Sequence, residues 1–412
     1  MSSDAVTRLT SDAVDVTPEG ALRDKLALGR PLRVKLGLDP TAPAVTLGWA
    51  VVLRKLRQFQ DEGHQAVLIV GDFTARVGDP SGKSTTRPRL SKEEVDGYAE
   101  RILDQFWKVV DRDTVELRRN SEWLEPLGLE DVLRLTSSTT VARMLERDDF
   151  AERFAAGRPI SLMELLYPLL QGYDSVAVEA DVELGGTDQL FNLLVGRELQ
   201  RDAGQDPQVA LTMPLLEGLD GIQKMSQSLG NYVGITEPPE EMFGKLMSIP
   251  DQLIAKYEQL AAGVGKEHSE RVSAGLLDGS IHPGEEKRRL ARTVVELYHG
   301  AGAGEAAEAA FDRVFRRHQA PEAIDDVVVP ADVFSQEEDG VWVVYVPALL
   351  EAMGLVASRS EARRLQAQGG VRVDGDPVPE EDLRVAGDPP GQYLGSVWQV
   401  GRRKFARLGG VA

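Results

Sequence analysis

Cysteine is absent from the 412 residues of this chain. A chain without cysteine forms no disulfide, thiol nucleophile or thiolate metal site, and because disulfides are typical of oxidising compartments, a cytoplasmic location is expected. Histidine is scarce as well. The five histidines are His64, His268, His282, His299 and His318. Because they fall at no spacing typical of metal ligands, we expect no structural metal ion.

Long apolar runs and net positive charge are also lacking. No stretch of about 18 apolar residues is present and the first residues are polar, so neither a membrane-spanning helix nor a signal peptide is expected. The formal net charge of −19 argues against non-specific binding of nucleic acid by the whole surface. The charge is uneven, because residues 341–412 carry nine Lys or Arg against eight Asp or Glu. A polyanion is therefore expected to prefer this C-terminal region.

Short apolar segments alternate with amphipathic ones from residue 33 to about 230, a pattern typical of a doubly wound α/β fold with a parallel sheet. Residues 34–38 and 66–72 predict the first two strands, with a helix between them. Ligands of such sheets bind at the carboxyl ends of the strands. The expected parts are an α/β domain at 1–235 with an inserted helical segment at about 120–180, a helical domain at 236–318, an acidic linker at 319–346 and a small α+β unit at 347–412.

The turn after the first strand and three cations predict a phosphate site. A helix N-terminus carries free N–H groups and a positive dipole end, so the turn at residues 39–41 suits an anion, and Gly48 lets a ligand approach the backbone. Lys83, Arg87 and Lys224 lie on Gly- and Ser-rich loops at the same expected edge of the sheet. We interpret them as catalytic cations that stabilise the charge on a leaving pyrophosphate. The alternative for each is an ordinary solvated loop charge.

Three polar residues fall on one face of an otherwise apolar predicted helix. Tyr167, Gln171 and Asp174 are four and then three residues apart. A buried Gln and a buried Asp each need hydrogen-bonding partners, and a bound polar ligand would supply them. The alternative is that both side chains form hydrogen bonds only inside the core. Lys35, on the first strand, is either part of this pocket or a charge at the strand edge.

Several motifs occur together and in order: DPTAP, GDFTA, GDPSG, YPLLQGYDS, DVELGGTDQ, LTMPLLEGLDG and, with one change, KMSQSLGNY. By these motifs the chain resembles the bacterial tyrosyl-tRNA synthetases, which are class I aminoacyl-tRNA synthetases, over essentially its full length. The resemblance implies a Rossmann-like catalytic domain that uses ATP, with Mg²⁺ only as the counter-ion of ATP, to join tyrosine to tRNA. It also implies a homodimer formed through the helices between about 120 and 170.

The resemblance also assigns roles to individual residues. Asp79, Tyr167 and Gln171 would meet the ammonium group of tyrosine. Asp174 would accept a hydrogen bond from the phenol hydroxyl, and Gln189 would lie near the carboxylate. The full tyrosine-binding set is Gly37, Asp39, Asp79, Tyr167, Gln171, Asp174 and Gln189. The nucleotide-binding set is Thr41, Thr46, Gly48, Trp49, Gly186, Asp188, Ser226 and Gln227.

Asp188 is the residue of this second set that would accept hydrogen bonds from the ribose hydroxyls, because an ionised carboxylate is an acceptor only. The alternative is an Asx turn that caps the following helix.

Residues 358–378 resemble an S4-type RNA-binding domain, with a basic helix, a Gly-Gly turn and a short strand pair. Basic side chains suit the backbone of structured RNA, so tRNA is the expected partner. The alternative is a solvated helix face. The RNA-binding set is Arg359, Arg363, Arg364, Arg402, Arg403 and Lys404.

Three positions depart from the ATP motifs of the resembled family. Thr46 and Trp49 stand where the family has two histidines, and Gln227 stands where it has the second lysine of a K-M-S-K-S loop. Removing one donor to transition-state charge costs about 3 kcal/mol, so ATP-dependent activation is expected to be impaired or specialised. Trp49 would fill the place of the adenine or stack on it. The alternative hypothesis is a divergent paralogue that binds tyrosine or tyrosyl-tRNA without making the adenylate, as a regulator or as a transferase in a biosynthetic pathway.

Overall fold

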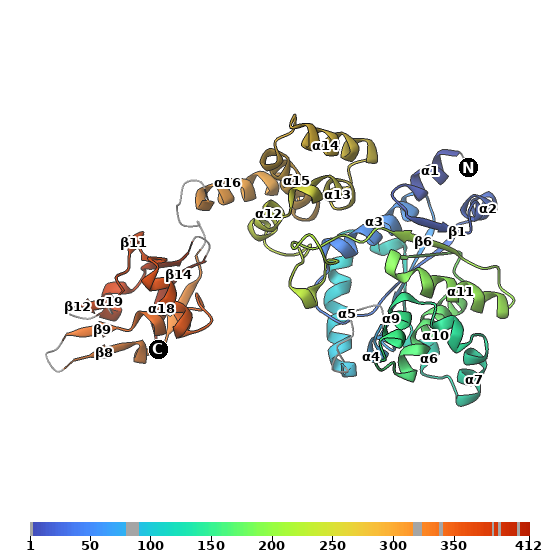
Figure 1. Ribbon diagram of the computed structural model, residues 1–412, viewed down its shortest axis with the longest axis horizontal. Helices are drawn as coiled ribbons and strands as arrows, with labels where there is room; N and C mark the ends of the chain where they lie inside the picture. The colour runs from blue at the N-terminus through green and yellow to red at the C-terminus, as the bar shows by residue number, and fades with distance from the viewer. Residues whose placement is uncertain are drawn as a thin grey trace. The chain divides into compact units, whose positions relative to one another are not determined.

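The structure is a computed structural model that describes residues 3–79, 90–315, 324–337, 341–380, 383–385, 389–401 and 404–412 (Figure 1). The chain divides into two compact units, Met1–Gly304 and Glu305–Ala412, and each is described by itself. Within the described ranges, no helix is both long and apolar enough to cross a membrane.

A sheet with the strand order β1-β6-β5-β2-β3-β4 forms the centre of the first unit. Its strands are β1 (Asp15–Thr17), β2 (Arg33–Leu38), β3 (Gln65–Val70), β4 (Val115–Arg119), β5 (Val182–Gly186) and β6 (Val209–Met213). All neighbouring pairs are parallel except β1 with β6. β3 and β6 are almost completely buried, as expected for parallel strands that are covered on both faces. The predicted doubly wound α/β fold is confirmed.

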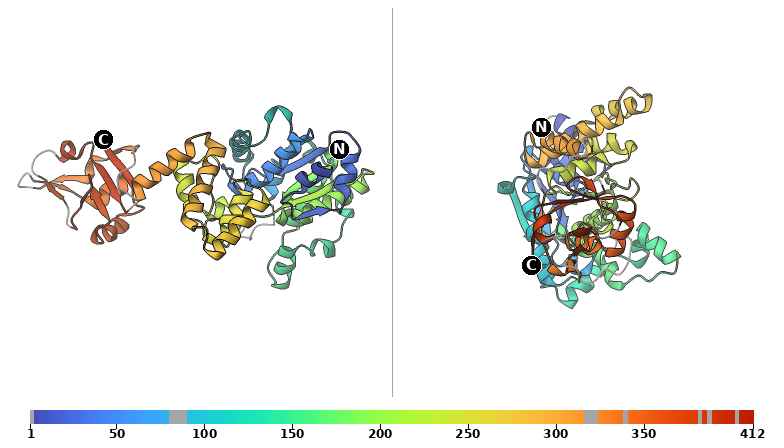
Figure 2. Two further views of the ribbon diagram at one scale, coloured as in Figure 1. Left: turned by 90° about the horizontal axis from the view of Figure 1, so that it is seen from above. Right: turned by 90° about the vertical axis from the view of Figure 1, so that its left-hand side faces the viewer.

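Helices lie on both faces of this sheet (Figure 2). The helices from the N-terminus to β6 are α1 (Ser3–Thr10), α2 (Ala21–Ala27), α3 (Leu47–Asp61), α4 (Thr74–Val77), α5 (Lys92–Phe106), α6 (Ser121–Leu124), α7 (Leu129–Ser137), α8 (Val141–Met144), α9 (Asp148–Ala155), α10 (Leu162–Ala177) and α11 (Leu190–Asp202). A second group follows β6, namely α12 (Pro239–Met247), α13 (Ile254–Leu260), α14 (Lys266–Asp278) and α15 (Pro283–His299). Short 3₁₀ turns are η1 (Arg112–Thr114), η2 (Thr187–Gln189), η3 (Gln227–Leu229) and η4 (Asp251–Leu253).

The sequence patterns do not predict the two edge strands of this sheet. β4 reads VELRR, and its partly exposed charged side chains suit an edge strand but give no apolar run. β1 has only three residues and pairs antiparallel with β6 at the opposite edge. Residues 236–299 are helical, as expected, but they belong to the same compact unit as the sheet. The domain boundary at 235/236 stays a prediction.

The second unit is α+β, as predicted. Its larger sheet has the order β11-β10-β13-β14-β7 and its smaller sheet the order β12-β9-β8. The strands are β7 (Asp326–Val329), β8 (Phe334–Gln336), β9 (Trp342–Val344), β10 (Val371–Val373), β11 (Asp376–Pro377), β12 (Leu383–Val385), β13 (Val397–Val400) and β14 (Lys404–Val411). The helices are α16 (Ala303–Phe315), α17 (Val346–Ala352), α18 (Arg359–Ala367) and α19 (Pro389–Tyr393), with a 3₁₀ turn η5 (Ala331–Val333). Trp398 is completely buried in the core of this unit.

The acidic linker predicted at 319–346 is wrong for the described part of that range. β7, β8 and β9 all lie within it, and Val329, Val333 and Phe334 are buried in the core of the second unit. Of the acidic residues that suggest a linker, Asp326 is exposed at the start of β7, while Asp325, Asp332 and Glu337 lie outside these short strands. The small α+β unit therefore begins before residue 347.

Candidate active site

The candidate site lies at the carboxyl ends of β2, β3 and β5, where the sequence predicts a ligand crevice. Asp39 follows β2, and Gly71 follows β3 beside it. A Cβ atom at Gly71 would lie 2.0 Å from Asp39 Oδ1, so only glycine fits there. On β2, no described atom lies within 4 Å of the place where a Cβ of Gly37 would be, so Gly37 borders open space.

Helix α10 carries three of the predicted tyrosine-binding residues. Ser161 and Glu164 form a capping box at its N-terminus, which fixes where the helix begins. The Tyr167 hydroxyl donates a hydrogen bond to Asp39 Oδ2 (3.0 Å). One turn further on, Gln171 Oε1 accepts a hydrogen bond from Asn192 Nδ2 on α11 (2.9 Å). The helix continues through Pro168, so the face predicted from the spacing is formed.

Asp174 is buried on the same helix and is held by two donors. Trp123 Nε1 donates to its Oδ1 (2.8 Å), and Asn120 Nδ2 donates to its Oδ2 (3.4 Å). Burial raises the pKa of Asp174 to about 7, although the Lys35 charge and the two donors act in the opposite direction. Trp123 and Asn120 give no signal in the sequence, because they meet Asp174 only through the fold.

A chain of hydrogen bonds joins Asp174 to a second carboxylate, that of Asp39. The Thr74 hydroxyl donates to Asp39 Oδ1 (2.7 Å), and Asn120 Nδ2 donates to the Thr74 oxygen (2.9 Å). Burial raises the pKa of Asp39 to about 7, and the nearby Asp79 raises it further. Burial and the neighbouring Asp39 also raise the pKa of Tyr167 well above its ordinary value. The pocket therefore holds two carboxylates that both titrate near neutral pH.

Lys35 is fully buried and is not a charge at the strand edge. It lies directly opposite Glu183 across β2 and β5, with Nζ 2.8 Å from Glu183 Oε1. Lys35 Nζ also donates to Ser175 Oγ (2.7 Å) and to the backbone oxygen of Gln171 (3.0 Å) on α10. The ion pair thus ties the helix that carries Asp174 to the centre of the sheet.

The predicted ammonium and carboxylate contacts, Asp79 and Gln189, also come together. Gln189 Nε2 donates to Asp79 Oδ2 (3.0 Å) and Gln189 Oε1 accepts from Asn192 Nδ2 (3.1 Å). Arg147, which the sequence patterns miss, places Nη2 3.4 Å from Asp79 Oδ1 and donates through Nη1 to Asn192 Oδ1 (3.1 Å). All seven predicted tyrosine-binding residues lie within the described residues, and hydrogen bonds connect six of them in two networks.

The predicted nucleotide-binding residues lie around the turn before α3 and the loop at 224–228, which together are called the nucleotide side. In the turn, the backbone N–H of Thr41 donates to the backbone oxygen of Asp39 (2.9 Å). Thr46 is buried and caps α3, because its hydroxyl accepts from the backbone N–H of Trp49 (3.3 Å). The Trp49 side chain is 36% exposed and lies beside Phe106, with ring centroids 6.3 Å apart. A small cavity of about 50 Å³ is lined by Asp39, Thr41, Trp49, Phe106, Gln227 and neighbouring apolar residues.

The loop at 224–228 faces this turn. Lys224 Nζ forms an ion pair with Asp188 Oδ2 (2.7 Å). Gln227 forms two hydrogen bonds with the backbone of Ala44. The hydroxyl groups of Ser226 and Ser228 are 2.9 Å apart. The structure therefore brings Lys224, Asp188 and Gln227 to one side of the site.

Two glycines of the nucleotide side, Gly186 and Gly48, lie close to other residues of the site. A Cβ at Gly186 would lie 2.7 Å from Asp188 Oδ1, and a Cβ at Gly48 would lie 3.5 Å from Met225. Lys83 and Arg87, the other predicted catalytic cations, lie outside the described residues.

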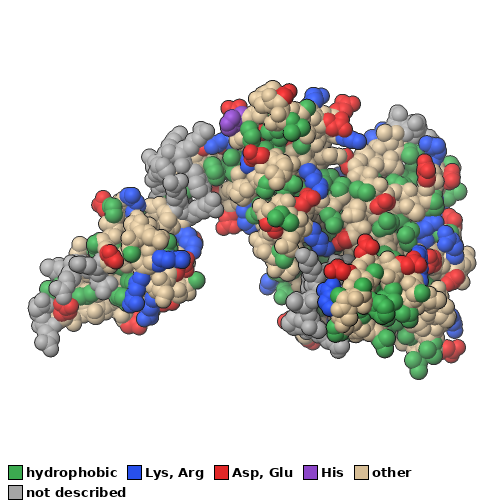
Figure 3. Space-filling view, in the orientation of Figure 1, with side chains coloured by type: hydrophobic (Ala, Val, Ile, Leu, Met, Phe, Trp, Pro, Cys, Tyr) green, Lys and Arg blue, Asp and Glu red, His purple; other side chains and the backbone are tan. Residues whose placement is uncertain are grey.

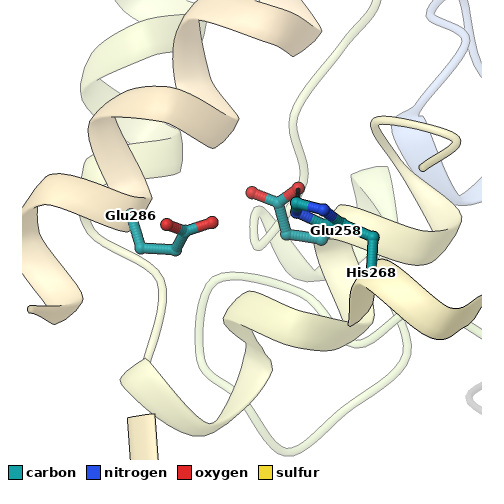
Figure 4. A group of neighbouring side chains, drawn as sticks. All are labelled: Glu258, His268 and Glu286. Carbon is teal, nitrogen blue, oxygen red and sulfur yellow. Dashed lines mark ion pairs between the residues drawn. The ribbon is translucent and has the colours of Figure 1, made fainter. Parts of the chain in front are cut away.

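A separate cluster of titratable side chains joins α13, α14 and α15 (Figure 4). The ligand-type atoms of Glu258, His268 and Glu286 lie within 4.8 Å of one another. Arg289 Nη2 lies among them, 2.8 Å from Glu258 Oε2 and 2.5 Å from His268 Nε2, and it also bonds Glu286. The guanidinium supplies the positive charge that a cation would bring. Burial and the neighbouring Glu286 raise the pKa of Glu258 to about 7. That the chain holds no structural metal stays a prediction.

In the second unit, α18 presents three exposed arginines, Arg359, Arg363 and Arg364. Arg359 pairs with Glu351 (2.8 Å), and the Arg363 guanidinium lies over the Tyr345 ring, 5.7 Å from its centroid. Lys404, on β14, donates to a backbone oxygen and is exposed. Figure 3 shows Lys and Arg side chains gathered on one side of this unit. Arg402 and Arg403 lie outside the described residues.

Comparison with known proteins places this chain in a family. Residues 27–316 match the family described as tRNA synthetases class I (W and Y). The tyrosine--tRNA ligase of Moorella thermoacetica is 51% identical over 404 residues, 97% of this chain and 94% of that protein. The tyrosine--tRNA ligase of Thermotoga maritima is 48% identical over 402 residues, 98% of this chain and 96% of that protein.

Solved structures agree with this match. The tyrosyl-tRNA synthetase of Archaeoglobus fulgidus, complexed with L-tyrosine, matches with a TM-score of 0.60 and 25% identity, over 74% of this chain and 98% of that one. The tyrosyl-tRNA synthetase of Aeropyrum pernix matches with a TM-score of 0.60 and 20% identity, over 75% of this chain and 98% of that one. The chain belongs to the tyrosyl-tRNA synthetase family of class I.

Proposed function

We propose that this chain activates tyrosine with ATP and transfers it to tRNA in the cytoplasm. The observation that carries the proposal is the convergence of Tyr167, Gln171 and Asp174 from one helix with Gln189, which follows β5, and Asp79, which follows α4. These are the residues that the family resemblance assigns to tyrosine. Relatives about half identical to the chain over nearly its full length are tyrosine--tRNA ligases, which supports the same activity.

In the proposed complex, the buried carboxylate of Asp174 accepts a hydrogen bond from the phenol hydroxyl of tyrosine. Trp123 and Asn120 already hold this carboxylate in place. Phenylalanine has no hydroxyl, so binding it would leave Asp174 without its ligand partner, and such unpaired buried groups give strong discrimination. Asp79, Tyr167 and Gln171 receive the ammonium group, and Gln189 lies near the carboxylate.

The nucleotide would bind between the turn at 39–46 and the loop at 224–228, with its ribose on Asp188. The acceptor-only chemistry of Asp188 and the close backbone approach at Gly186 fit a ribose. A carboxylate oxygen of tyrosine then attacks the α-phosphorus of ATP, and pyrophosphate leaves. Lys224 neutralises charge on the phosphates, together with Lys83 and Arg87 and with Mg²⁺ carried by ATP.

We propose that this activation is slow or specialised. The Thr46 hydroxyl caps α3 by accepting a hydrogen bond from the backbone N–H of Trp49. The side-chain oxygen and nitrogen of Gln227 both bond the backbone of Ala44. Neither side chain is directed to a phosphate in this arrangement. Trp49 keeps a partly exposed indole on which an adenine can stack.

The same engagement of Thr46 and Gln227 favours a second candidate function, a paralogue that binds tyrosine or tyrosyl-tRNA without forming the adenylate. Tyrosine-dependent exchange of labelled pyrophosphate into ATP separates the two functions. Exchange above background supports the enzyme. Its complete absence at high enzyme concentration, with tyrosine binding retained in a calorimetric titration, supports the paralogue instead.

We also propose that tRNA binds through the second unit. The exposed side chains of Arg359, Arg363, Arg364 and Lys404 support this role, because Lys and Arg contact phosphates. Alanine at Arg363 and Arg364 together should weaken tRNA binding and reduce its salt dependence, as measured by filter binding at several salt concentrations.

A homodimer through the helices between β4 and β5 is the proposed assembly. Leu129, Leu133, Val141, Phe154 and Leu162 are each at least 60% exposed on α7 to α10. Figure 3 shows hydrophobic side chains gathered where Figure 1 places α7. Exposed apolar surface of this kind is typical of an interface. Sedimentation analysis of Phe154→Glu tests the dimer, because a buried charge would separate the subunits.

A further inference from the structure

The side-chain amide of Gln227 bonds both backbone polar groups of a single residue, Ala44, across the site. Its Oε1 accepts from the backbone N–H of Ala44 (3.1 Å), and its Nε2 donates to the backbone oxygen of Ala44 (2.6 Å). A side-chain amide offers an acceptor and a donor side by side in this way at any pH. A lysine, with three donors and no acceptor, cannot pair with the N–H of Ala44.

Gln227 extends a contact that the two backbones already make. The N–H of Leu47 donates to the Val233 oxygen (2.9 Å), and the N–H of Ile235 donates to the Val45 oxygen (2.9 Å). Residues 44–47 and 233–235 therefore lie side by side. Gln227 adds its pair of hydrogen bonds at the end of this ladder and brings the loop at 224–228 against the turn.

Several backbone N–H groups that follow the turn already donate hydrogen bonds to other protein groups. The N–H of Val45 donates to Gln105 Oε1 (2.8 Å), and that of Trp49 donates to the Thr46 hydroxyl. With Ala44 and Leu47, four backbone N–H groups between residues 44 and 49 have partners inside the protein. Two of them, those of Leu47 and Trp49, lie in the first turn of α3, so they are engaged at the helix N-terminus that the sequence predicts as an anion site.

A second anchor holds the same loop over the ribose site. Lys224 Nζ pairs with Asp188 Oδ2 at 2.7 Å, and both side chains remain partly exposed. A nucleotide whose ribose binds Asp188 must displace the Lys224 side chain. If the loop at 224–228 moves with Lys224, the hydrogen bonds between Gln227 and Ala44 must break. Exposed ion pairs are weak and exchange easily, whereas the paired amide resists the movement.

We propose that Gln227 is a positioning residue that latches the loop at 224–228 onto the turn at 39–46, so that nucleotide binding must first release it. The latch itself is independent of catalysis, and only its effect on ATP rests on the proposed function. Because binding-competent molecules are then a minor population, the apparent affinity for ATP is reduced by the cost of release.

The latch is tested first without nucleotide, by hydrogen exchange of the apo chain. Gln227→Ala should speed exchange of the Ala44 N–H about tenfold, as expected for the loss of two hydrogen bonds. Gln227→Lys should do the same, because lysine has no acceptor. Gln223→Ala, at an exposed glutamine directly before this loop, is the matched control and should leave the rate unchanged. Unchanged exchange in Gln227→Ala would overturn the proposal.

The consequence is tested by calorimetric titration with Mg·ATP. Gln227→Ala should bind ATP more tightly than the unaltered chain, by up to about tenfold, while tyrosine affinity stays the same as evidence that the variant is folded. Faster exchange with equal or weaker ATP binding would also overturn the proposal, since Gln227 would then not oppose the nucleotide. Absence of pyrophosphate exchange would contradict the proposed enzyme activity but would leave both of these measurements valid.

Discussion

The tyrosine side and the nucleotide side of the candidate site are built in different ways. On the tyrosine side, Lys35 and Asp174 are removed from solvent and bond to other buried groups. On the nucleotide side, Lys224 pairs at the surface, and Gln227 and Thr46 bond to the backbone. A buried charge cannot lose its partner without a large cost, whereas a surface pair can. Substitutions can therefore accumulate on the nucleotide side without unfolding the protein.

The largest expected effect is on the buried ion pair. Lys35→Met should reduce the free energy of unfolding by about 3–5 kcal/mol, because it leaves the carboxylate of Glu183 buried without its cation. Denaturant unfolding measures the loss. Arg57→Met removes the exposed pair with Asp61 and is the surface control, with an expected change of at most about 0.5 kcal/mol.

The double variant Lys35→Met with Glu183→Gln should recover part of the stability, because the uncompensated charge is gone. If Lys35→Met alone reduces the free energy of unfolding no more than Arg57→Met does, the buried ion pair does not hold α10. The tyrosine side would then tolerate substitution as well as the nucleotide side does.

The next effect concerns ligand recognition. Asp174→Asn should weaken tyrosine binding about ten- to hundredfold, because a hydrogen bond to a charged acceptor is lost. Phenylalanine binding should be unaffected, so the ratio of the two affinities isolates the phenol contact. Calorimetric titration with both amino acids measures it. Equal losses for tyrosine and phenylalanine would place the phenol ring elsewhere.

A smaller effect is expected from pH. The pKa of Asp174 is raised to about 7, so below that pH the group is protonated and does not accept from the phenol. Tyrosine affinity should therefore rise up to about tenfold between pH 6 and pH 8. Trp123→Phe removes a donor that lowers this pKa, so the midpoint should move to higher pH. A midpoint that does not move would show that another group controls the profile.

The smallest expected change in stability is on the nucleotide side. Lys224→Ala should alter the free energy of unfolding by less than about 1 kcal/mol, because its pair with Asp188 is partly exposed. Pyrophosphate exchange should nevertheless fall about a hundredfold if Lys224 neutralises transition-state charge. Measuring both quantities in one variant separates the structural from the catalytic contribution of this lysine.

The sequence predicts the parts of the fold that local patterns encode. Apolar strands such as β3, the helix face of Tyr167 and Asp174, and the α+β character of the second unit follow from periodicity and motifs. The edge strand β4 does not, because three of its five residues are charged and give no apolar run. The strands at 326–344 are not predicted either, because each has only three or four residues and acidic residues lie among them.

The residues that hold the site residues in place are also not predicted from the sequence. Trp123 meets Asp174 and Arg147 meets Asp79 across many residues of chain, so no local spacing relates them. Lys35 shows the limit most clearly. Its position in an apolar strand leaves two readings open, and only the register of β2 against β5, which places it opposite Glu183, decides between them.

The parallel pairing of β7 with β14 has a consequence for synthesis on the ribosome. β7 (Asp326–Val329) is the first described strand of the second unit, but its sheet partner is β14 (Lys404–Val411), the last. All strands of the first unit lie between Asp15 and Met213, so its sheet can form while translation continues. β7 must wait, unpaired, until residues 404–411 have left the exit tunnel. Nascent chains stalled just before residue 404 should therefore be cut by protease within the second unit while the first unit resists.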